Sequence, residues 1–166
     1  MNQTFKEFLT EHGADPDTIQ QATRYYLAER LGDISPQEMR QQLTNALEGE
    51  GEVNMLLRQL EADTNAVDEA SLIILSSAWE EPDQTGLVDG AITDAKKKLP
   101  VIETGIIAIV AMYGMWLVVT GGIKRSSRTV NRNSDGSFEE KDTVDYYDST
   151  GALSKIVDLF KTRMGL

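Results

Sequence analysis

The residues best suited to chemistry lie in the last quarter of the chain, where oxygen-bearing side chains alternate ahead of a glycine. Asn131, Asn133 and Asp135, followed by Gly136 and later by Asp142, have nearly the spacing of an EF-hand calcium loop. Amide and carboxylate oxygens are the hard ligands that calcium prefers. The pattern departs from that loop because it begins with Asn, ends with Asp in place of a bidentate Glu, and has strand-like flanks. An Asp-Gly turn between two strands is the simpler interpretation.

Other side chains that could perform acid–base or metal chemistry are isolated. The chain has one histidine, His12, and no cysteine, which excludes disulfides, thiolate catalysis and cysteine-based metal sites. It has no metalloprotease, phosphate-binding, nucleophile-elbow or dinucleotide-binding motif. Glu103 lies at the edge of an apolar stretch, where an ionisable group can be functional, but a first-turn glutamate that matches the helix dipole is the simpler interpretation. We expect no enzyme, no cofactor and no resident metal.

The charge of the chain is unevenly distributed over its 166 residues. The net charge is −11. Residues 1–95 hold 19 acidic and 5 basic side chains, whereas residues 96–166 hold 8 acidic and 11 basic ones. The acidic first part repels phosphate backbones, so we expect no nucleic-acid partner. The first residues lack a basic segment followed by an apolar one, so no signal peptide is expected.

The elements that would position any site are mainly helical. Residues 1–98 are predicted to form a small antiparallel bundle of short helices, because apolar residues recur at helical spacing between clear start and stop signals. Asp15-Pro16 and Ser35-Pro36 are such starts, the second with Glu38 completing a capping box. The acidic run 48–52 contains two glycines and is predicted to be a solvated loop. A further helix is expected to start at Asp83.

The chain is organised around residues 104–123, twenty residues without a charge. As a helix that rises about 1.5 Å per residue, they would be roughly 30 Å long, the thickness of a bilayer's hydrocarbon core. Basic residues lie on both sides, at 96–98 and at 124–125, as they do around membrane helices. The alternative is a central helix wrapped by the others in a soluble protein, which a chain this small is expected to achieve only by oligomerisation.

The composition inside this stretch favours contact with protein. Small residues recur at every third position, and two aromatic residues lie deep in the stretch and not at its ends. We therefore expect self-association along the helix. The candidate positions for membrane or oligomer contact are Gly105, Ala108, Ala111, Tyr113, Gly114 and Trp116.

After the apolar stretch the periodicity changes. Counting the apolar helix as residues 99–123, residues 124–148 are predicted to form a β-hairpin region, in which Arg128 and Arg132 would face Glu139 or Glu140. Residues 143–147 are a candidate third strand. Residues 149–166 are predicted to form a C-terminal amphipathic helix that docks on the bundle or on a membrane surface.

The stretch LPVIETGIIAIVAMYGMWLVVTGGIKRSSRTVNRNSDGSFEE, with the helical module before it, resembles effector-associated and adaptor modules of bacterial conflict and defence systems. The resemblance covers roughly residues 70–160 and rests on pattern, without a catalytic signature. It implies an antiviral adaptor or membrane-acting effector that self-assembles and works with a sensor or protease. No site residues carry over from it.

Two functions follow as expectations. The first is a non-enzymatic bacterial protein that assembles through its bundle and inserts residues 104–123 in the inner membrane, with the bundle in the cytoplasm. The second is a cytoplasmic, soluble interaction module that buries the same residues in its core or in a subunit interface. Both expect a homo-oligomer and a protein partner. The basic residues on both flanks leave membrane orientation open.

Overall fold

The computed structural model describes residues 3–47, 50–98, 104–120, 123 and 128–142. These residues form seven helices and one two-stranded antiparallel sheet, so the predicted mainly helical class with a β-hairpin is confirmed. In chain order the elements are α1 (Phe5–His12), α2 (Pro16–Leu31), α3 (Pro36–Leu47), α4 (Glu50–Ala62), α5 (Thr64–Trp79), α6 (Thr85–Lys97), α7 (Thr104–Thr120), β1 (Arg128–Arg132) and β2 (Phe138–Asp142). The predicted third strand and C-terminal helix lie outside the described residues.

The predicted start signals fix the second and third helices. The Asp15 carboxylate accepts a hydrogen bond from the Thr18 backbone N–H at 2.7 Å, so it caps α2 ahead of its proline. Ser35 and Glu38 form the predicted capping box, each side chain accepting from the backbone N–H of the other. Gly13 separates α1 from α2 with a φ of 57°, a left-handed conformation that favours glycine at a helix end.

Two predicted boundaries were wrong. Helix α4 begins at Glu50, so part of the acidic run that we expected to be a loop is the first turn of a helix. Carboxylates at Glu50 and Glu52 are favourable there because the N-terminal end of a helix carries partial positive charge. Helix α6 begins at Thr85 instead of Asp83, and no side-chain hydrogen bond caps it.

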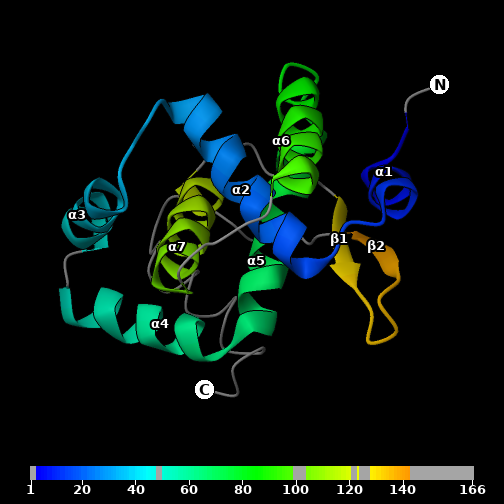
Figure 1. Ribbon diagram of the computed structural model, residues 1–166. Coiled ribbons are helices and arrows are strands. Elements are labelled where there is room, and N and C mark those ends of the chain that lie inside the picture. The colour runs from blue at the N-terminus through cyan, green and yellow to red at the C-terminus, as the bar shows by residue number, and fades with distance from the viewer. Residues whose placement is uncertain (1–2, 48–49, 99–103, 121–122, 124–127, 143–166) are drawn as a thin grey trace.

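The helices are arranged around α7 (Figure 1). Helices α2 and α5 lie against one side of α7, and α3 and α4 lie against the other. Helix α6 packs on α2 and α5, while the hairpin packs on α5 with α1 beside β2. The helices are not all aligned as in a simple antiparallel bundle, since α4 runs crosswise to α5 (Figure 1).

An ion pair with little exposure fixes the hairpin to this framework. The Arg132 Nε donates to the Asp68 carboxylate of α5 at 3.1 Å, and its Nη2 donates to the Ala14 carbonyl at 3.2 Å. The predicted pairing with glutamates is wrong at Arg132, because the register places that residue opposite Phe138. Asp68 is 6% exposed. Burial raises the pKa of Asp68, and the Arg132 cation only partly offsets this.

The raised pKa gives a test of this anchor. The folded chain binds a proton at Asp68 more tightly than the unfolded chain does, so wild type should gain stability relative to Asp68→Asn as the pH falls from neutral. The gain in stability should be complete below about pH 4, the ordinary pKa of an aspartate. Urea denaturation of both proteins across this range measures it, with Asp94→Asn, at an exposed position of α6, as the matched control. A difference between wild type and Asp68→Asn that stays constant with pH would contradict this account.

Candidate functional site

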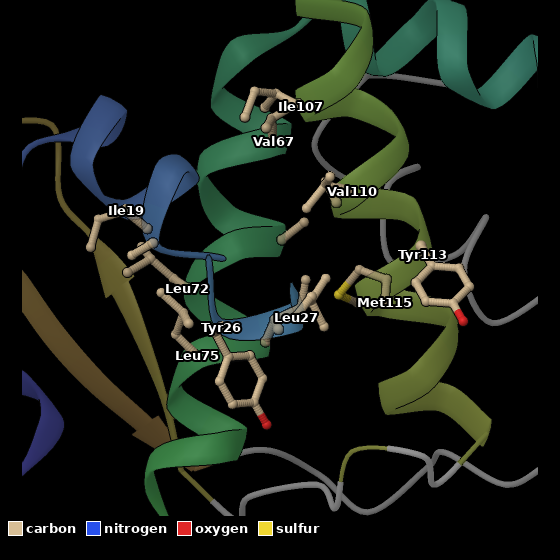
Figure 2. Packing of buried hydrophobic residues seen from close by; sticks show 14 of the residues in the cluster. Ile19, Tyr26, Leu27, Val67, Leu72, Leu75, Ile107, Val110, Tyr113 and Met115 are labelled. Atoms are coloured by element: carbon tan, nitrogen blue, oxygen red, sulfur yellow. The ribbon is translucent and has the colours of Figure 1, made fainter. Parts of the chain in front are cut away.

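Helix α7 is the feature that most distinguishes this chain, because the protein covers it on every side. All residues from Ile107 to Met115 are buried, a run of more than two helical turns that leaves no exposed face. In Figure 2, Ile107 faces Val67 of α5, and Met115 lies beside Leu27 of α2. Tyr113 projects from the side of α7 that points away from α5. The middle of the uncharged stretch, from Ile107 to Met115, therefore lies in the core of the fold.

The small residues of α7 allow the closest of these contacts. A Cβ atom at Gly114 would lie 2.4 Å from Ile74 Cδ1 and 3.5 Å from Leu27 Cδ1, so α5 and α2 both approach the helix there. Ala108 and Ala111 are also buried. Gly105 differs from them, since it is exposed and a Cβ there would meet only the Glu61 side chain, at 3.3 Å. Three of the four small residues, Ala108, Ala111 and Gly114, thus pack against other helices of the same chain.

The aromatic residues Tyr113 and Trp116 lie on the side of α7 that faces α3. The Tyr113 hydroxyl donates to the Gln42 side-chain oxygen of α3 at 2.6 Å. Its ring lies 5.4 Å from that of Trp116, which is half-buried. Burial raises the pKa of Tyr113, in the direction that favours the protonated hydroxyl as the donor of this hydrogen bond.

Two findings bear on the expectations about the apolar helix. Among the described helices, none is both long enough and apolar enough to cross a bilayer. Helix α7 has 17 described residues, about 26 Å at about 1.5 Å per residue. The expectation that a chain this small needs oligomerisation to bury such a helix is wrong, because α2, α3, α4 and α5 of the same chain cover it together.

The residues of the predicted calcium loop form a hairpin turn. The Asp135 carboxylate accepts from the Ser137 backbone N–H at 2.9 Å, and Gly136 has a φ of 90°. Asn131 lies within β1, and the backbone carbonyl of Asn133 accepts from the Gly136 N–H at 3.0 Å. Asp142 pairs with Arg128 at the far end of the ladder. That end is about 14 Å along the strand from the turn, so these four residues do not converge on one ion.

The remaining sequence candidates do not form a reactive group. The His12 Nδ1 lies 2.9 Å from the Phe8 carbonyl, one turn earlier in α1, and the His12 ring lies 4.1 Å from the Phe8 ring. His12 is therefore the last residue of α1, and its side chain contacts the preceding turn of the same helix. Glu103 lies outside the described residues. Within the described ranges, no group of three His, Cys, Asp or Glu side chains is placed to hold a metal ion.

Sequence reasoning missed two pairs of side chains on which this arrangement depends. Gln42 and Tyr113 are 71 positions apart, and Asp68 and Arg132 are 64 positions apart. Gln42 carries no signal of its own in the sequence. Asp68 carries a weak one, because it is an acidic residue within the most apolar stretch of the first half of the chain.

No family model, curated protein or solved structure matches this chain. Similarity therefore assigns neither a family nor a function. The likeness to bacterial defence modules stays a prediction from the sequence.

The close contact at Gly114 gives a prediction about stability. Gly114→Ala should lower the free energy of unfolding by about 1–3 kcal/mol, because the added methyl overlaps Ile74 in a packed core. The matched control is Gly90→Ala in α6, where a Cβ would meet nothing within 4 Å. That change should raise stability by up to about 1 kcal/mol, because alanine favours the helix. Urea denaturation measures both.

A second substitution distinguishes steric overlap of the new methyl with Ile74 from a general effect of alanine on the helix. Ile74→Val removes the Cδ1 atom that the new methyl would meet, so it should cost less in the Gly114→Ala background than in wild type. Equal costs in the two backgrounds would mean that α7 does not pack against α5 at this point.

Proposed function

We propose that this chain is a non-enzymatic protein-interaction module of the adaptor class, built around α7 as its core, and that it acts in the cytoplasm. It binds other protein chains through its outer surface. Self-association belongs to the same proposal. It would use surfaces other than α7, because the small positions at Ala108, Ala111 and Gly114 already contact the rest of the same chain.

One observation carries this proposal: a single copy of the chain buries all the apolar side chains of α7 between Ile107 and Met115. An apolar helix that lacks neighbours needs a bilayer or another subunit. Here the neighbours are α2, α3, α4 and α5. The apolar composition of α7 is then explained without a membrane. The surface that binds partners is expected on the outside of the fold.

The non-enzymatic part of the proposal is supported by the sequence and by the roles of its few reactive side chains. The ring of the one histidine lies tilted against the Phe8 ring, and its Nδ1 contacts the Phe8 carbonyl. Among the described residues, the buried carboxylate of Asp68 pairs with Arg132 and so attaches the hairpin to α5. A buried acid used in this way is a structural group and not a general base.

Val110→Arg tests the core assignment. Val110 is 2% exposed, so an arginine there buries an unpaired charge and should lower the free energy of unfolding by about 4 kcal/mol or more. The cooperative thermal transition should be lost. Met55→Arg is the matched control, because Met55 is 50% exposed, and its effect should stay within about 0.5 kcal/mol. The central role of α7 is wrong if the two variants unfold alike.

Light scattering after size-exclusion chromatography of the wild type and Met55→Arg tests whether the chain self-associates. Without detergent, the wild-type chain should elute as one species whose mass is at least twice the 18.4 kDa of a single chain, and a monomer would contradict the self-association. Met55→Arg should elute with the same mass unless α4 takes part in the contact. A chain that stays in solution only with detergent would overturn the proposed function.

A second candidate, the membrane-acting effector, is favoured by the way in which α3 and α4 are attached. Helix α3 packs mainly on α7 and α4, and α4 packs on α7, α3 and the adjoining α5. This pair reaches the rest of the molecule largely through α7. Its movement would uncover one side of an uncharged helix while α2, α5, α6 and the hairpin stay packed together.

Cross-linking distinguishes the two functions. The chain has no cysteine, so Gln42→Cys and Tyr113→Cys introduce a unique pair across α3 and α7, which a short bis-maleimide can bridge. The proposed function predicts no dye release from phosphatidylethanolamine–phosphatidylglycerol vesicles with or without the bridge. The membrane function predicts release by wild type and by the unbridged pair, and its loss on bridging.

A further inference from the structure

A cleft opens between the end of α1, the start of α2 and the turn of the hairpin, away from α7. Its volume is about 620 Å³, within the range of ligand pockets in proteins. Ala14, Pro16 and Phe138 give it an apolar lining, whereas Lys6 and Arg132 bring positive charge. The cleft therefore combines an apolar surface with cations, and sequence reasoning gave no indication of it.

Arg132 is held rigidly in this cleft. Its Nε donates to Asp68, its Nη2 donates to the Ala14 carbonyl, and its guanidinium lies 4.6 Å from the centre of the Phe138 ring. These contacts use two of its N–H groups, and the described residues supply no partner for the others. The side chain keeps 15% of its surface exposed. A guanidinium fixed by stacking loses little further entropy when it binds an anion.

The surroundings of Arg132 are more positive than the chain as a whole. Asp15 also lies in the cleft lining, and its pKa is lowered mainly by hydrogen bonding to the Thr18 side chain and next by the hydrogen bond from the Thr18 backbone N–H. The cations Arg132 and Lys96 lower the pKa of Asp15 further. Lys6 and Lys96 are exposed, and the Lys96 ammonium reaches the His12 carbonyl at the end of α1. The cations Lys6, Lys96 and Arg132 stand here against the carboxylates Asp15 and Asp68, a balance less acidic than that of the whole chain with its charge of −11, and it suits an anionic partner.

We propose that this cleft binds a carboxylate-bearing peptide segment of a partner protein. The carboxylate would accept from the N–H groups of Arg132 that have no partner among the described residues and lie near the Lys6 ammonium, while an adjacent apolar side chain packs on the exposed Pro16 and the accessible edge of Phe138. The anion-binding chemistry follows from the cleft itself. That the anion belongs to a protein rests on the proposed function.

Two blocked tripeptides, Leu-Asp-Leu and Leu-Asn-Leu, serve as probes that differ only in the carboxylate. Each is titrated into the ¹⁵N-labelled full chain while amide chemical shifts are followed. The Asp peptide should give saturable shifts at Thr10, Gly13 and Ser137, which line the cleft. The Asn peptide should bind at least tenfold more weakly. Equal affinity of the two peptides, shifts scattered over the molecule, or shifts caused equally by sodium acetate would each overturn the proposal.

Variants identify the groups that bind. Lys6→Gln should weaken the Asp peptide severalfold, and Lys97→Gln, an exposed lysine of α6 outside the cleft lining, should leave its affinity unchanged. Arg132→Gln alone would leave Asp68 buried without its partner, so it is combined with Asp68→Asn. The double variant should retain the amide spectrum of the helices and lose tripeptide binding. Binding that persists in this folded variant would exclude Arg132 as the recognition group.

Failure of this site and failure of the proposed function give different results. If wild type assembles without detergent but does not bind the Asp peptide, the cleft proposal is wrong and the interaction module stands. If the Asp peptide binds but the chain needs detergent to stay in solution, the cleft stands and the proposed function is wrong.

Discussion

The burial of α7 is the constraint on which the rest of this structure depends. A helix that is apolar on every side has no face to present to water, so it must be covered completely. In this chain α2 and α5 supply one half of the cover, and α3 and α4 supply the other. Gly114 lets α5 and α2 approach closely, and the hydrogen bond between Tyr113 and Gln42 satisfies the one hydroxyl in the buried run.

The elements outside this core depend on it indirectly. Helix α5 contacts α7 on one side and carries β1 on another, so the hairpin reaches the core through that helix. The ion pair between Asp68 and Arg132 fixes this attachment, and the same arginine lines the cleft beside α1. One guanidinium thus joins the packing of the hairpin to the surface that we propose for partner binding. Breaking a buried pair of this kind leaves an uncompensated charge, which is costly.

The sequence predicts the local structure of this protein better than its contacts. Asp15-Pro16, the Ser35 capping box and the Asp135-Gly136 turn identify element boundaries because each acts on its own backbone. The surroundings of residues 104–120 could not be predicted, because lipid and a protein core favour the same apolar side chains. Arg132 illustrates the same limit: we expected a cross-strand partner, and the side chain instead reaches α5.

Hydrogen exchange of the full chain in detergent-free buffer tests the central claim most directly. If α7 is the core, the amides from Ile107 to Met115 should exchange among the slowest in the protein, with protection that matches the global free energy of unfolding from urea denaturation. The amides of α1 should exchange faster, because that helix packs at the edge of the fold beside β2. Exchange of the α7 amides as fast as those of α1 would contradict the account.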